Sequence, residues 1–266
     1  YSTEQDVDVA TETLQDDPVP PAGVVNPDAR YAYVIDWNQR HAPRALAKLW
    51  DLGYRVRSAR KPFDTGTRAF SRGTLIVLRG RNPDKQDPAA DMERVARETG
   101  VRIHGLDTGR MEEGIDLASR NSRVVDEPKT ALLVDQPFST YTSGQIWYLF
   151  DQETRLPVTR IRSSSLEGTG TGEGRYVRYG KADINDYDVL ILPGAGRLEA
   201  VFDSTQQAAL KDWVRRGGTL VATEESATFF TEETSGFTDV EAVEDTTEAT
   251  GPYTPFIARG DSAGLD

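Results

Sequence analysis

The stretch RRGGTLVATEESATFF, Arg215–Phe230, carries the clearest fold signal in the sequence. Its two glycines end a predicted helix, TLVAT predicts a short buried strand, and ESATFF predicts the start of another helix. In α/β enzymes the turn between such a strand and helix commonly carries the nucleophile. Here the turn consists of Thr223, Glu224, Glu225 and Ser226. The stretch therefore contains either an active site of unfamiliar chemistry or a fold without its nucleophile.

The sequence before this stretch alternates strands and helices and predicts an α/β unit over residues 126–266. Predicted strands lie at 129–135, 156–162, 184–192 and 219–223, and predicted helices lie at 143–153 and 204–216. Helices that alternate with apolar strands indicate a flavodoxin-like, doubly wound parallel sheet, with ligand clefts at the carboxyl ends of its strands. Such a sheet normally has more strands, so we expect this unit to be truncated.

A smaller α/β unit is predicted over residues 31–125. Its expected order is β-α-β-β-α-β, from the segments YAYVIDW, APRALAKLWDLG, YRVRSA, GTLIVLRG, PAADMERVARETG and VRIHGL. Two arrangements stay open, a split-βαβ sandwich and a small Rossmann-like sheet. Residues 1–30 are acidic and then proline-rich, which predicts a linker or the tail of an upstream domain.

Composition limits the possible chemistry and partners. The chain of 266 residues has no cysteine, which excludes disulfides, thiolate zinc ligands and a cysteine nucleophile. The net charge of −12 disfavours nucleic acid as a partner, because phosphates would be repelled. No apolar run reaches the ~18 residues of a membrane span, so no membrane insertion is expected.

The acid excess is accompanied by an unusual choice of basic residues. Lysine and arginine together number 31, and only six of them are lysines. This balance fits a halophilic protein that stays soluble at high salt, although a GC-rich genome produces the same arginine bias. The N-terminal segment lacks both the basic region and the apolar region of a signal peptide. The sequence starts at Tyr1 and not at methionine, which suggests a fragment.

Two segments of the second unit resemble class I glutamine amidotransferase-like domains. DYDVLILPGAG places glycines where that superfamily forms its oxyanion hole, and LKDWVRRGGTLVATEESA places its last turn at the nucleophile elbow. With KTALLVDQPFSTYTSGQIWYLFDQETRLPVTRI before them, the order resembles the C-terminal region of bacterial zinc carboxypeptidases of the carboxypeptidase A type. AYVIDWNQRHAPRALAKLWDLGYRVRSARKPF and VRIHGLDTGRMEEGIDLASRNSRVV resemble the segment between peptidase and amidotransferase-like domain in those proteins. The resemblance covers residues 32–230.

The resemblance implies a secreted or periplasmic parent protein with zinc in an upstream peptidase domain, which would be the partner of this chain. The peptidase holds zinc through an H-x-x-E pair and a later histidine. This chain has only His41 and His104, followed three residues later by Arg44 and Asp107. We therefore expect no metal site and no catalytic residue of the peptidase in this chain.

The amidotransferase triad is also incomplete. The elbow offers Glu224, Glu225 and Ser226 in place of cysteine, and no histidine follows. The glutamates are expected to begin a helix and favour its positive end, although a carboxylate pair in a cleft can also bind a cation or act as acid and base. Gly194 and Gly196 are interpreted either as a remnant oxyanion-type loop or as a tight turn.

Three functions follow from these observations. The first is a non-catalytic accessory region of a secreted zinc metallocarboxypeptidase, whose parent activity is proteolysis at the C-terminal peptide bond. The second is a free-standing small-molecule binding or sensor domain with a degenerate amidotransferase fold. The third is a hydrolase of unknown type that uses Glu224, Glu225 or Ser226.

Overall fold

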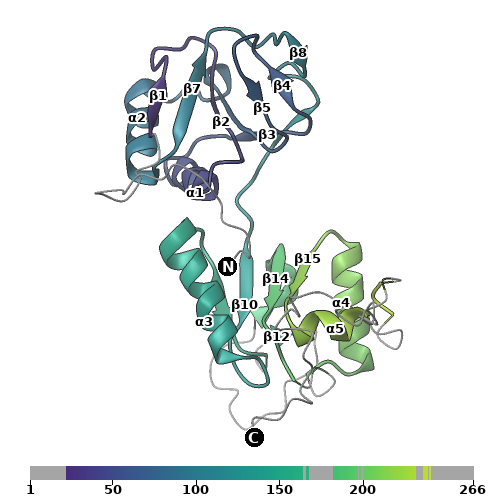
Figure 1. Ribbon diagram of the computed structural model, residues 1–266. Coiled ribbons are helices and arrows are strands. Elements are labelled where there is room, and N and C mark those ends of the chain that lie inside the picture. Colours follow the sequence, from purple (N-terminus) through teal and green to yellow (C-terminus); the bar gives the residue numbers. More distant parts are fainter. Residues whose placement is uncertain are drawn as a thin grey trace, which may run out of the picture. The chain divides into compact units, whose positions relative to one another are not determined.

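The computed structural model describes residues 22–163, 166–167, 182–196, 198, 201–231, 236–238 and 240. These residues form a mixed α/β protein with parallel and antiparallel sheets, which confirms the α/β class predicted from the sequence. The chain divides into two compact units (Figure 1). The first consists of Tyr1–Pro128 and Ile146–Val158, and the second consists of Lys129–Gln145 and Thr159–Asp266.

The main sheet of the first unit has six strands in the order β1-β7-β2-β6-β3-β9. In this order the strands are β1 (Gly23–Val25), β7 (Arg102–Leu106), β2 (Ala32–Ile35), β6 (Leu75–Leu78), β3 (Arg57–Ala59) and β9 (Ser122–Val124). From β7 to β9 each strand is antiparallel to the next in this order, whereas β1 pairs in parallel with β7. This is the split-βαβ order, one of the two arrangements that the sequence left open, and not a parallel Rossmann-like sheet.

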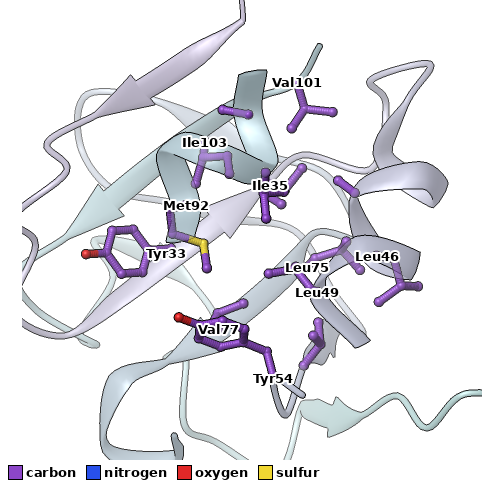
Figure 2. Packing of buried hydrophobic residues seen from close by; sticks show 14 of the residues in the cluster. Tyr33, Ile35, Leu46, Leu49, Tyr54, Leu75, Val77, Met92, Val101 and Ile103 are labelled. Carbon is purple, nitrogen blue, oxygen red and sulfur yellow. The ribbon is translucent and has the colours of Figure 1, made fainter. Parts of the chain in front are cut away.

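Two helices cover one face of this sheet. They are α1 (Ala42–Asp51), which has proline in its first turn, and α2 (Pro88–Thr99), which begins after an Asp87 cap and ends at Gly100 with φ +74°. Figure 2 shows the core between the helices and the sheet, where Leu46 and Met92 pack with strand side chains. Because strand side chains alternate between faces, Tyr33 and Ile35 of β2 enter this core and Val34 enters the opposite one.

The opposite face of the sheet is covered by a small three-stranded sheet that the sequence did not predict. Its order is β5-β4-β8, with β4 (Phe63–Asp64), β5 (Ala69–Phe70) and β8 (Glu113–Gly114). Phe63 and Phe70 stack with ring centroids 5.1 Å apart and lie in a second core with Leu117. Two-residue strands carry no periodic pattern, so only this packing identifies them.

The expected linker over residues 1–30 needs a correction where the structure describes it. Gly23–Val25 forms β1 and pairs in parallel with β7. Asn26 Nδ2 donates to Asp107 at 3.2 Å, and the backbone N–H of Arg30 donates to the same carboxylate at 2.8 Å. This backbone hydrogen bond is the main cause that lowers the pKa of Asp107. Residues 23–30 therefore belong to the first unit, and residues 1–21 lie outside the described part of the chain.

The second unit contains a four-stranded sheet in the order β11-β10-β14-β15, in which every pair is parallel. The strands are β10 (Thr130–Leu133), β11 (Thr159–Ile161), β14 (Val189–Leu192) and β15 (Thr219–Ala222). A separate parallel pair joins β12 (Leu166–Glu167) and β13 (Ala182–Asp183). The described α-helices that begin in this unit are α3 (Thr140–Tyr148), α4 (Ser204–Arg215) and α5 (Glu225–Thr231). Helix α3 continues as a π-helix over Leu149–Thr154, which the division assigns to the first unit.

A cluster of buried side chains lies on one face of this sheet. Leu133 of β10 and Leu192 of β14 pack there with Leu210 and Trp213 of α4 and Phe230 of α5. Figure 1 shows α3 alongside β10, whereas α4 and α5 lie near β14 and β15. The described helices are each too short or too polar to cross a membrane.

Candidate functional site

Polar residues of the second unit follow three of its parallel strands. Asp135 and Ser139 follow β10, Gly194 and Gly196 follow β14, and Glu224 follows β15. The carboxyl ends of parallel strands meet at one edge of the sheet, which is where sheets of this kind bind ligands. The sequence-predicted site residues therefore lie at a position suited to function.

Glu224 adopts an unusual backbone conformation at the turn between β15 and α5. Its φ is +54°, in the left-handed region that a side chain normally avoids. This conformation costs roughly 1–2 kcal/mol for a residue other than glycine. The glutamates were both expected to begin the helix, but α5 begins at Glu225 and Glu224 lies in the turn before it. The strand-turn-helix thus contains a strained residue, as nucleophile elbows do.

The side chain of Glu224 reaches across to α3. The hydroxyl of Thr142 lies 3.0 and 3.1 Å from the two carboxylate oxygens and donates a hydrogen bond to them. The same hydroxyl lies 3.2 Å from Oγ of Ser139, whose Oγ also accepts from the backbone N–H of Thr142 at 3.3 Å. The carboxylate of Glu224 is therefore engaged by a side chain of α3.

The loops after β10 and β14 are joined to each other. The backbone N–H of Ser139 donates to the carbonyl of Gly194 at 2.7 Å, and Phe138 forms an antiparallel bridge with Ala195. Phe138 is buried. These contacts fix Gly194 in position against the glutamates.

Gly194 faces negative charge. A Cβ placed on Gly194 would lie 2.1 Å from Oε2 of Glu224 and 2.8 Å from Oε2 of Glu225, whereas a Cβ on Gly196 would meet nothing within 4 Å. An oxyanion hole needs donors and positive potential around the developing charge. Two carboxylates against Gly194 oppose such a charge, so this arrangement favours the tight-turn interpretation of the loop.

Ser226 is unsuited to act as a nucleophile. Its side chain is fully buried, and its hydroxyl donates to the carbonyl of Pro193 at the end of β14. A nucleophilic serine needs an exposed hydroxyl that hydrogen-bonds to a base. The hydroxyl of Ser226 instead ties the start of α5 to the β14 loop.

We expect alanine at Gly194 to destabilise the second unit by about 1 kcal/mol, the lower end of overpacking costs, because the new methyl group displaces the exposed Glu224 carboxylate and would lie 3.0 Å from Cβ of Glu224. Gly196→Ala is the matched control and should change stability by less than about 0.5 kcal/mol. Neither glycine has a left-handed φ, so only contacts distinguish them. Urea unfolding of both variants, and of Gly194→Ala combined with Glu224→Ala, gives the measurement. Equal costs with and without the Glu224 side chain would show that the two residues do not interact.

The two histidines of the chain belong to the first unit, whereas this edge of the parallel sheet belongs to the second unit. His41 precedes α1 and His104 lies in β7. Among the described residues no group of three histidine, aspartate or glutamate side chains is placed to hold a metal ion. The resemblance places its zinc in an upstream peptidase domain, so this finding does not bear on that zinc.

His104 is packed in an apolar and basic environment. Its ring meets Phe70 edge-on with centroids 5.5 Å apart, and its buried Nε2 has no hydrogen-bond partner within the part of the chain that is described. Burial is the main cause that lowers the pKa of His104, Arg68 and Arg102 lower it further, and Asp36 opposes them.

We expect the first unit to lose stability as the pH falls below about 6.5, the ordinary pKa of histidine in an unfolded chain. The unfolded chain takes up the proton first because the folded pKa is lower, and the loss levels off below the folded pKa. Unfolding free energies of the wild type and of His104→Gln across this pH range provide the comparison. An identical pH dependence in both proteins would contradict the assignment to His104.

Thr142 and Ser139 are the site residues that sequence reasoning missed. Both lie around the start of α3, and nothing in their local pattern signals a contact with Glu224, which is 82 residues from Thr142 in the sequence. No protein-family model, curated protein or solved structure matches this chain.

Proposed function

We propose that this chain is a non-catalytic accessory region of a secreted zinc metallocarboxypeptidase. In this proposal the second unit is a flavodoxin-like, amidotransferase-like domain that has kept the elbow and lost the nucleophile. The observation that carries it is the conformation of Glu224, with φ +54° in the turn between β15 and α5. Backbone strain of this kind persists where the surrounding structure holds it, and it is typical of functional turns.

The residues around the turn at Glu224 support the proposal that this site has lost its catalytic activity. The second unit contains no histidine, so it offers no imidazole of its own to activate a carboxylate at this turn. Glu224 is already bound by Thr142, and the hydroxyl of Ser226 is buried. Acyl transfer needs an activated nucleophile and donors for the oxyanion, and the described residues of the second unit supply neither.

The parent reaction would be hydrolysis of the C-terminal peptide bond of a substrate. Zinc supplies a polarised carbonyl and an activated water in that reaction. The residues of this chain would take no chemical part. They would support or orient the peptidase domain, or restrict access to it.

The gene upstream of Tyr1 tests this proposal directly. An in-frame peptidase domain with an H-x-x-E motif supports the accessory role, and an open reading frame without one would rule it out. Where the domain is present, kinetics of the protein with and without residues 1–266 measure what the accessory region does. We expect catalysis to persist without the region, with a changed KM, because the zinc site lies outside it.

The second candidate is a small-molecule binding or sensor domain. Glu224 and Glu225 are both exposed at the carboxyl edge of the parallel sheet, which favours a cationic ligand over an anionic one. Calorimetry with arginine, lysine and divalent cations tests this role. Binding that is lost in Glu225→Gln would favour it over the accessory role, and no heat with any of these ligands would count against it.

A further inference from the structure

The first unit contains a pocket of about 500 Å³ with a mostly charged lining. This volume lies within the range of roughly 300–1,000 Å³ that is typical of small-molecule sites. The residues that line the pocket all belong to the first unit: Arg44, Ala47, Lys48, Asp51, Glu98, Thr99, Glu127, Arg155 and Pro157. The pocket is therefore not part of the elbow at Glu224, which belongs to the second unit.

Helices α1 and α2 form one side of the pocket. The ammonium group of Lys48 on α1 lies 3.1 Å from the carboxylate of Glu98 on α2 and 3.5 Å from that of Asp51. Residues spaced i, i+3, i+4 and i+7 lie on one face of a helix, and the lining residues of α1 have this spacing: Arg44, Ala47, Lys48 and Asp51. The packing of the two helices thus fixes this part of the lining.

The remaining charges of the lining are two guanidinium groups and one carboxylate. Lys48 is already held by two carboxylates, so it is neutralised within the pocket. The side chains of Arg44, Arg155 and Glu127 form no hydrogen bond or ion pair with other described residues. These three groups are therefore the ones that a ligand can engage.

The balance of charge decides which kind of ligand fits. Guanidinium groups bind carboxylates and phosphates through paired hydrogen bonds. A phosphate is disfavoured because three carboxylates line the same pocket and the chain carries a net charge of −12. A carboxylate carries less charge, and Glu127 can accept hydrogen bonds from an ammonium group. A ligand with one group of each sign keeps the pocket neutral, because the lining has three basic and three acidic side chains.

We propose that this pocket binds a zwitterion of amino-acid or short-peptide size. Arg44 and Arg155 hold the carboxylate of the ligand, and Glu127 holds its ammonium group. Ala47 and Pro157 supply apolar contacts for its aliphatic carbons. The inference does not depend on the accessory role, because that role rests on the elbow of the second unit.

Calorimetry of the whole chain with alanine, alanylalanine and trialanine tests the proposal. We expect at least one of these zwitterions to bind with a dissociation constant below about 1 mM. The best binder is then compared with its N-acetyl form, which lacks the ammonium group, and with its C-terminal amide, which lacks the carboxylate. Each should bind about 10-fold more weakly, because each loses one charge-assisted contact. No binding of any zwitterion up to about 10 mM, or equal affinity for the blocked forms, would overturn the proposal.

Two substitutions test which side chains hold the ligand. Arg155→Gln should weaken the zwitterion about 10-fold and leave the affinity for the amide form unchanged. Glu127→Gln should weaken the zwitterion by a similar factor and leave the affinity for the N-acetyl form unchanged. Arg97→Gln is the matched control, because Arg97 is an exposed arginine of α2 that does not line the pocket. An equal loss of affinity in Arg97→Gln and Arg155→Gln would contradict the assigned contact.

Discussion

Replacing Trp213 with alanine should destabilise the second unit by about 3–5 kcal/mol, the range for truncating a buried aromatic side chain. Trp213 is only 3% exposed and lies in the core with side chains of β14 and α5. Its indole N–H donates to the carbonyl of Tyr187 at 3.2 Å. Gly218 packs so closely on the indole that a Cβ there would lie 2.3 Å from Cε2.

Urea unfolding followed by circular dichroism measures this cost, because tryptophan fluorescence is itself changed by the substitution. Trp37→Ala is the matched control. Trp37 is 39% exposed in the first unit, so its removal should cost much less. Trp213→Phe keeps most of the packing and should cost less than alanine. A loss below about 1 kcal/mol for Trp213→Ala would show that α4 does not pack on the sheet as described.

Alanine at Gly105 should destabilise the first unit by about 3 kcal/mol, at the upper end of overpacking costs. A Cβ at Gly105 would lie 2.0 Å from the carbonyl oxygen of Asn26 and 2.6 Å from Cβ of Ala29. The oxygen belongs to the backbone, so a change of side-chain rotamer cannot relieve the overlap. The segment that carries β1 would have to move away from β7.

Gly80→Ala is the control for this variant, because a Cβ there would meet nothing within 4 Å. Neither Gly80 nor Gly105 has a left-handed φ, so the difference between them reports contacts alone. Thermal unfolding of both variants gives the measurement. Similar unfolding midpoints for the two variants would mean that residues 23–29 do not pack on β7. A linker over residues 1–30, as expected from the sequence, would give that result.

Regular elements could be predicted from the sequence because their patterns are local. The segments that became β2, α1, β3, β6, α2 and β7 carry alternating or helical apolar positions with glycine stops. Their spatial order could not be predicted, because sheet order depends on tertiary packing. Strand β1 was missed because its three residues lie in a proline-rich segment and are defined only by pairing with β7.

The place of the candidate residues in the sheet could be predicted from the sequence, but only part of their local geometry could. The glutamates and glycines follow strands, so their meeting at one edge of the sheet follows from the pattern. The left-handed φ of Glu224 and its contact with Thr142 depend on the distance between two separate elements. No property of either residue type signals such a contact.

In the proposed function, the second unit keeps the elbow without its chemistry. Turnover of glutamine, C-terminal peptide and ester substrates by the purified chain, with and without added zinc, tests this proposal. We expect no turnover above the buffer rate, and the same result for Glu224→Gln. Turnover by the wild type that disappears in Glu224→Gln would contradict the proposal and identify Glu224 as a catalytic residue.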